Sequence, residues 1–198
     1  MTYISKLPSQ LLWVLSLLVA LVSWRFLVFG VDPSMPGVVH HLDGRELALW
    51  AHIFFAPIAL AMVPFQLSQN LRRTRLGLHR WMGRAYGVAI LISGVAGLII
   101  APYAATGTVA AVGFLLLSVA WLITTGLAIW HAMNRRISDH RRWIIRSAAL
   151  TFAAVTLRLQ LPLGEVFWGF ETAYPFIAWL CWLPNLVFAE WYLRRQGW

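Results

Sequence analysis

Long apolar stretches alternate with short polar segments along almost the whole chain. Six predominantly apolar runs are separated by segments rich in Gly, Pro, Asn and Arg, which favour turns. A helix of about 20 apolar residues is long enough to cross a bilayer. The pattern therefore predicts an all-α, integral membrane bundle of six spanning helices. The predicted spans cover residues 11–30, 46–67, 81–103, 108–132, 143–163 and 173–193.

The composition supports this architecture and limits what else the chain can contain. Of 198 residues, 60% are hydrophobic and only 12% are charged, about half the charged fraction of soluble domains, which excludes a water-soluble globule. Six spans use roughly 120 residues, so residues 1–198 are expected to form a single multi-pass transmembrane domain. Spans two to five are expected to form its four-helix core. The first run is longer than a typical signal-peptide core and lacks a small-residue cleavage site, so we expect a retained helix.

The Lys and Arg residues predict the orientation of the chain. With the N-terminus inside, 13 of the 16 fall on the inner side, which carries a net charge of +11 against −2 outside. Positive residues stay on the cytoplasmic side, so both termini are predicted to be cytoplasmic, in a bacterial inner membrane. Contact with anionic lipid explains the basic charge without nucleic acid. The 13 residues are Lys6, Arg72, Arg73, Arg75, Arg80, Arg84, Arg135, Arg136, Arg141, Arg142, Arg146, Arg194 and Arg195.

Two segments that lead into spans three and five look alike. His79-Arg80-Trp81 and His140-Arg141-Arg142-Trp143 lie about 60 positions apart, and each is followed by a further Arg. One interpretation is a parallel duplication, in which spans two and three correspond to spans four and five. A chance match of His-Arg beside a membrane is the alternative.

Span three carries an almost bare face behind its histidine. His79 is followed at helical spacing by Gly83 and Gly87, and then by Gly94 and Gly97. Such a stripe allows close helix packing in membranes. It would also leave room for a flat cofactor with His79 as its ligand, and the two interpretations are compatible.

Span five offers a second ligand, because His140 enters its helix at the same depth as His79. Neutral imidazoles from two helices are a common way to hold haem iron, so haem b bound by His79 and His140 is a candidate. Interfacial anchoring by the His-Arg pairs is the alternative. A three-histidine metal site that includes His131 is a weaker option. Four arginines are placed to pair with haem propionates, namely Arg80, Arg84, Arg141 and Arg146.

Other polar residues lie within the predicted spans. His52 and Arg158 are expected at similar depth in the outer half, where they would bind a quinone headgroup or another small polar substrate. The alternative is an interhelical contact in which Arg158 extends toward Glu165. Glu190 is expected to form an ion pair with Arg84 or Arg146, and Asn185 to satisfy backbone groups freed by Pro184.

The two His-Arg segments, extended to His79–Tyr86 and His140–Thr151, and the ending Pro184-Asn185…Ala189-Glu190-Trp191 resemble a bacterial family of predicted membrane proteins, domain of unknown function 2306. The resemblance covers spans two to six and implies a multi-pass inner-membrane protein without an established activity. More distantly, histidines on alternate helices are similar to the di-haem transmembrane cytochrome b family. His79 and His140 match the pair on spans three and five of that family. His52 and His131 differ in depth and cannot share one iron, so only one haem near the inner side is expected. One haem there could not carry electrons across the membrane.

The leading hypothesis is a b-type cytochrome-like electron-transfer protein. The sequence has no Walker or dinucleotide-binding loop and no metalloprotease motif. A redox partner would therefore be another membrane protein, a quinone or a diffusible small molecule. The alternative is a non-enzymatic membrane module, such as a small transporter, an accessory subunit of a larger complex or an assembly factor, without haem.

Overall fold

The computed structural model describes residues 7–197, and side chains from residue 10 onward; Lys6, expected on the inner side, lies outside the described residues. The described residues form helices and connecting turns, with no strand among them. The α-helices are α1 (Leu7–Ser23), α2 (Phe26–Phe29), α3 (Val31–Ser34), α4 (Glu46–Leu67), α5 (Gln69–Thr74), α6 (Leu76–Ile100), α7 (Thr108–Met133), α8 (Ile137–Thr151), α9 (Ala153–Trp168), α10 (Phe170–Leu180) and α11 (Leu183–Arg195), and the 3-10 helices are η1 (Pro36–His41) and η2 (Ala101–Tyr103).

Six helical segments are long and apolar enough to span a membrane, which confirms the predicted number. Many of their large apolar side chains point outward, including Leu47, Met133 and Val166, which are 85%, 78% and 80% exposed. An apolar surface of this extent is expected where helices contact lipid. The chain is therefore an all-α multi-pass membrane protein in contact with the bilayer.

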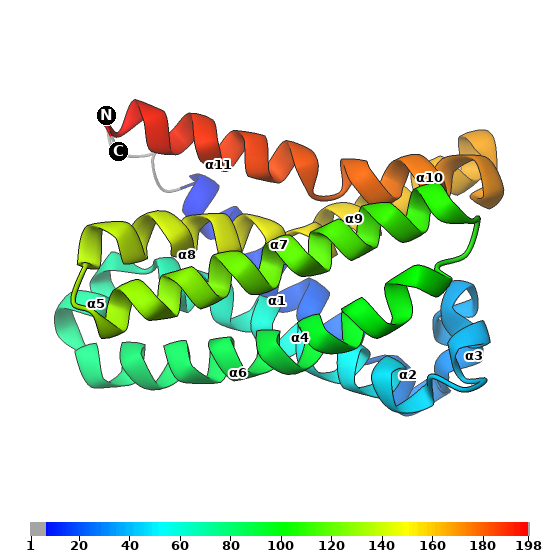
Figure 1. Cartoon of the computed structure of the whole chain (residues 1–198), viewed down its shortest axis with the longest axis horizontal. Coiled ribbons are helices and arrows are strands. Elements are labelled where there is room, and N and C mark those ends of the chain that lie inside the picture. Colours follow the sequence, from blue (N-terminus) through cyan, green and yellow to red (C-terminus); the bar gives the residue numbers. More distant parts are fainter. Residues whose placement is uncertain (1–6, 198) are drawn as a thin grey trace.

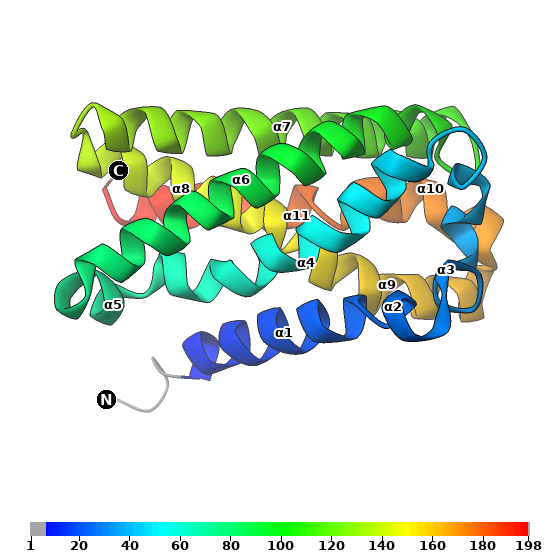
Figure 2. The same cartoon turned by 90° about the horizontal axis from the view of Figure 1, so that it is seen from below.

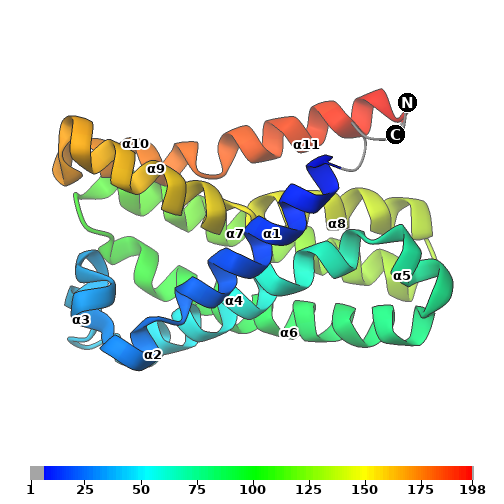
Figure 3. The same ribbon diagram turned by 180° about the vertical axis from the view of Figure 1, so that it is seen from behind.

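Helices α4, α6, α7 and α8 form the centre of the bundle (Figure 1). α6 packs against α4 and α7, and α8 packs against the same two helices, so α6 and α8 lie diagonally across the bundle. Spans two to five thus form the predicted four-helix core. α1 crosses α4 and α9 on the outside, as Figures 2 and 3 show, while α10 and α11 cover α7, α9 and α8.

Two spans begin earlier than their apolar runs predict. The third candidate span starts at Leu76 and the fifth at Ile137, in place of residues 81 and 143. The additional residues form amphipathic first turns that carry both His-Arg segments. A hydropathy pattern ends at the first polar residues, whereas the backbone hydrogen bonds of a helix continue through them.

Spans five and six are each broken near the middle. The fifth breaks at Phe152 between α8 and α9, and the sixth at Cys181 and Trp182 between α10 and α11. Polar side chains join the two breaks: Asn185 Nδ2 donates to the Cys181 carbonyl at 3.0 Å, and the Thr156 hydroxyl donates to the same oxygen. The carbonyl that Pro184 leaves without its helical donor, that of Leu180, accepts instead from Gln160 Nε2 at 3.2 Å, so Asn185 satisfies the next carbonyl along the chain and not the one expected.

The two ends of the bundle differ in character. The turn around α5, the α7–α8 turn and the C-terminal end of α11 lie at one end, called here the arginine-rich end (Figures 1 and 2). The opposite end is capped by α3 and η1, where His40 Nε2 donates to the Tyr103 carbonyl at 2.7 Å and Arg45 lies 3.9 Å from the centroid of the Tyr103 ring. The arginine-rich loops therefore share one end of the molecule, as the charge pattern predicts.

Candidate functional site

A cavity of about 710 Å³ lies between α6 and α7, close to the arginine-rich end. Its volume falls within the range of about 300–1,000 Å³ usual for small-molecule sites. α6 and α7 supply most of its lining, and α4 and α8 complete it. The lining residues are Gln66, His79, Arg80, Gly83, Arg84, Tyr86, Gly87, Val88, Ile90, Leu91, Leu122, Thr125, Gly126, Ala128, Ile129, Ala132, Met133, His140 and Ile144.

The structure brings His79 and His140 to this one cavity from diagonal helices. His140 Nδ1 lies 2.8 Å from the carbonyl oxygen of Ala128. A carbonyl oxygen only accepts hydrogen bonds, so Nδ1 carries the proton and the Nε2 lone pair remains available to a ligand. A hydrogen bond of this kind orients an imidazole that binds a metal.

His79 is held less completely than His140. Its side chain is buried, with 9% exposed, and its Nδ1 makes no hydrogen bond. The backbone carbonyl of Phe65, the guanidinium of Arg72 and the imidazole of His140 lie near its ring. A buried polar atom without a partner costs free energy, so His79 is available to a ligand in the cavity.

The glycines of span three serve both packing and the cavity. A Cβ at Gly87 would lie 2.8 Å from Ile129 Cδ1, and one at Gly94 would lie 2.7 Å from Leu122 Cδ2. These two positions bring α6 and α7 close together. Gly87 also lines the cavity, so a packing role and a cavity role coexist at one residue.

The four arginines expected to meet propionates are divided between two places. Arg80 and Arg84 line the cavity. Arg146 instead forms a paired hydrogen bond with Glu190, with Nε–Oε1 and Nη2–Oε2 distances of 2.5 and 2.9 Å, which confirms the expected ion pair. Arg141 lies outside the lining, near Arg72.

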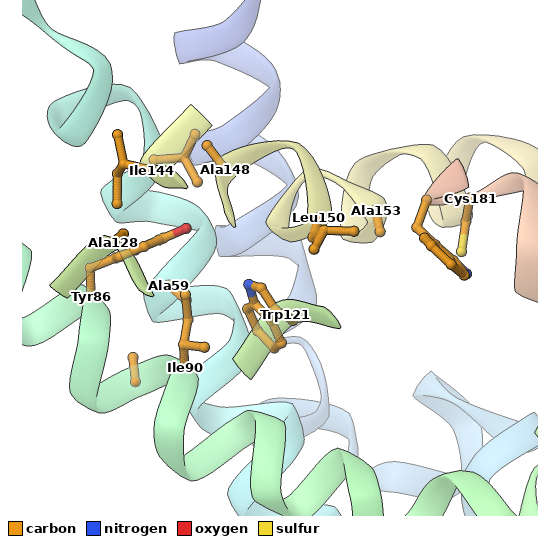
Figure 4. Close-up of a cluster of buried hydrophobic side chains, with 13 residues drawn as sticks. Ala59, Tyr86, Ile90, Trp121, Ala128, Ile144, Ala148, Leu150, Ala153 and Cys181 are labelled. Atoms are coloured by element: carbon orange, nitrogen blue, oxygen red, sulfur yellow. The ribbon is translucent and has the colours of Figure 1, made fainter. Parts of the chain in front are cut away.

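A buried polar cluster forms the inner wall of the cavity. The Tyr86 hydroxyl lies 2.8 Å from both Ser147 Oγ and Thr151 Oγ1, Trp121 Nε1 donates to Thr151 Oγ1 at 2.8 Å, and Thr125 Oγ1 lies 2.7 Å from Ser147 Oγ. Figure 4 shows Tyr86 and Trp121 among the surrounding apolar side chains. The cluster ties α6, α7 and α8 together on the side of the cavity away from its mouth.

Sequence reasoning missed three polar residues of the lining, Gln66, Tyr86 and Thr125. The polar face that includes Ser147 and Thr151 was visible at helical spacing, but their partner Tyr86 lies about 60 positions earlier. Gln66 is a buried amide inside span two. Its isolation in an apolar run was the available signal, since buried polar groups require partners.

His52 and Arg158 lie apart from this cavity. His52 Nδ1 donates to the Ser93 carbonyl at 2.8 Å, and Arg158 Nη1 donates to the Ala154 carbonyl of its own helix at 3.0 Å. Both side chains thus have backbone partners, although they are within electrostatic range of each other. Over residues 7–197 no ion pair joins Arg158 to Glu165.

The three-histidine metal site is a wrong expectation. Within the described part of the chain, no three His, Cys, Asp or Glu side chains are grouped to hold a metal ion. His131 instead lies 3.8 Å from an oxygen of Asp139 and against the Trp130 ring. Only His79 and His140 reach the cavity because the end of α7 directs His131 toward the start of α8.

Comparison with known proteins places this architecture in a family. The model of a predicted membrane protein family, DUF2306, matches residues 49–193. The chain belongs to this family. The matched segment of DUF2306 contains most of α4, all of α5 to α10, most of α11 and every residue that lines the cavity. No curated protein and no solved structure matches the chain.

Proposed function

We propose that this DUF2306 protein binds haem b between His79 and His140 and transfers single electrons within the membrane. The observation that carries the proposal is the shared cavity, which receives one imidazole from each of two diagonal helices. Pairs of imidazoles on facing helices are a common way to ligate haem in helical bundles. The chain's distant similarity to di-haem cytochromes remains a prediction consistent with this site.

The donor set fits the group. The His140 imidazole is fixed by its bond to Ala128, and the His79 ring lies beside a backbone carbonyl at the end of α4. Each histidine thus lies next to the last turns of the spanning helix that precedes it, α4 for His79 and α7 for His140. This parallel supports a duplicated helix pair, in which each copy contributes one ligand.

The remaining lining residues account for the other requirements of a haem site. Arg80 and Arg84 can offer paired hydrogen bonds to carboxylates, which guanidinium groups match in geometry. Ile90 and Leu122 provide apolar walls that exclude water. When bound, haem supplies an iron that gains or loses one electron. His79 and His140 would hold the iron, and Arg80 and Arg84 would neutralise the propionates.

The position of the site limits the path of the electron. All proposed ligands lie toward the arginine-rich end, which we place at the cytoplasmic side of a bacterial inner membrane because of its charge. One haem at this end cannot carry an electron across the full bilayer. We therefore propose exchange with a partner at the same side.

An absorption spectrum of the detergent-extracted protein tests the proposal. Protein from haem-replete cells is expected to show a Soret band, and His79→Ala or His140→Ala is expected to abolish it. His131→Ala is the matched control, because His131 lies at the same end of the bundle but outside the cavity; it should keep the band. A colourless, folded wild-type preparation would reject haem binding and favour a membrane module without a cofactor, for which His79→Gln should be tolerated.

A further inference from the structure

The side chain of Gln66 has an unusual position in the lining of the cavity. It is only 3% exposed, and its Nε2 has no hydrogen-bond partner. Its backbone carbonyl accepts a hydrogen bond from Arg72 Nη1 at 3.4 Å, so the backbone at the end of α4 is tied down. Leaving a buried donor unsatisfied costs free energy, so this amide is suited to a bound ligand.

Gly83 provides the space for this side chain. Gln66 Oε1 lies 3.2 Å from the place that a Cβ on Gly83 would occupy. A larger residue there would have to displace the carboxamide from the wall of the cavity. The pairing of Gln66 with Gly83 therefore holds an amide between α4 and α6, where His79 Nδ1 is a second atom without a partner.

The polarity of the cavity changes along its length. Gln66, Arg80 and Arg84 line it toward the arginine-rich end, whereas Ile90 and Leu122 line it further into the bundle. The polar side chains offer hydrogen-bond donors, so this end favours an anionic edge of a ligand and the deeper end an apolar edge.

We infer that Gln66 is a ligand-binding residue whose Nε2 donates a hydrogen bond to a carboxylate at the polar edge of the bound cofactor. The inference rests on the proposed haem site and adds a residue that recognises the propionate edge. A hydrogen bond to a charged acceptor is stronger than one to a neutral acceptor. Gln66 would therefore determine both the affinity of the site and which edge of the cofactor faces the arginine-rich end.

The test is a spectroscopic titration of the full-length apoprotein with haem b and with its dimethyl ester, in which both carboxylates are blocked. Gln66→Met removes the amide and keeps the length of the side chain. We expect this variant to raise the dissociation constant for haem b by about 10- to 100-fold. The change for the dimethyl ester should be much smaller, because a neutral acceptor forms a weaker bond.

Gln69→Met is the matched control, because Gln69 lies three residues later, is exposed and does not line the cavity. It should leave both dissociation constants unchanged. Equal loss of affinity for haem b and the ester, or no loss for either, would overturn the role of Gln66 while haem binding stands. Failure of the wild type to bind haem b would reject the proposed function itself. If Gln66→Met does not fold, Gln66→Asn, which withdraws the amide by one methylene, takes its place with the same expected outcomes.

Discussion

His41 is a buried histidine in the loop that caps the end of the bundle opposite the arginines. Its side chain is 4% exposed, and Arg45 Nε donates to its Nδ1 at 3.4 Å. Burial, together with the charges of His40, Arg45 and His52, lowers the pKa of His41 to about 4. The fold therefore holds this imidazole in its neutral form.

Stability of the cap is expected to fall as the pH is lowered from about 6.5 to 4. In this interval the unfolded chain binds a proton on His41 that the folded chain does not, so the free energy of unfolding decreases as the pH falls. We expect a loss of about 1–2 kcal/mol, since solvent beside the loop screens part of the charge. Thermal unfolding at pH 7 and pH 4.5 measures it. His41→Gln, which cannot titrate, should show a smaller difference between the two values; an equal difference would contradict this role.

The residues around the cavity show what sequence could and could not reveal. His79, Gly83 and Gly87 were predictable because their spacing places them on one face of a helix, and His140 because it enters its span at the depth of His79. Tyr86 was not, because its hydroxyl partners belong to a helix remote in the sequence. Spacing along one helix defines a face, whereas a partner on another helix depends on how the two helices pack.

Helix α7 contains one glycine, Gly113, that is packed closely against a neighbouring helix and another, Gly126, that is not. A Cβ on Gly113 would lie 3.0 Å from the Ala178 carbonyl oxygen and 2.9 Å from Trp179 Nε1, so this glycine allows α10 to approach. A Cβ on Gly126 would meet nothing within 4 Å. The first glycine is required by packing between helices, and the second leaves open space at the cavity.

Alanine at these two positions should therefore have opposite effects on stability. Gly113→Ala is expected to lower the free energy of unfolding by about 1–3 kcal/mol, because backbone on α10 must move. Gly126→Ala should be neutral or stabilise by up to about 1 kcal/mol, since alanine favours a helix. Unfolding of the apoprotein in mixed detergent micelles compares the two variants. Similar values for both would show that the α7–α10 contact does not limit stability.

The sequence predicted the number and order of the spanning helices, but it did not predict where a span is broken. The apolar runs located all six spans, but the break at Phe152 falls where no glycine or proline marks it. The bend there is accompanied by a contact between spans, since the Thr156 hydroxyl reaches the Cys181 carbonyl. A local sequence pattern cannot predict a bend of this kind, because the bend depends on how two distant segments pack.

At the scale of the whole molecule, the arginine-rich end sets the expected topology. Arg73 in α5 and Arg135 in the α7–α8 turn lie at this end, and Asp43 lies in the turn between η1 and α4 at the other. The charge difference predicts that the arginine-rich end faces the cytoplasm.

Cysteine labelling can test this topology, because the native Cys181 is buried. Arg73→Cys should react with a membrane-impermeant maleimide only after the cells are opened, whereas Asp43→Cys should react in intact cells. The reverse result would move both histidines to the outer side of the membrane. Labelling of both positions in intact cells would contradict the six-span arrangement.

The mouth of the cavity opens between α6 and α7 toward the bilayer. Val88, Leu91, Ile129 and Met133 line it and are 55%, 59%, 42% and 78% exposed, and all four are apolar. A ligand that dissolves in hydrocarbon can therefore enter the cavity laterally from the bilayer. Because an amphiphilic ligand partitions into the bilayer, its concentration beside the mouth of the cavity would exceed its concentration in water. The protein would then bind this ligand after insertion into the membrane, without exposing the interior of the bundle to water.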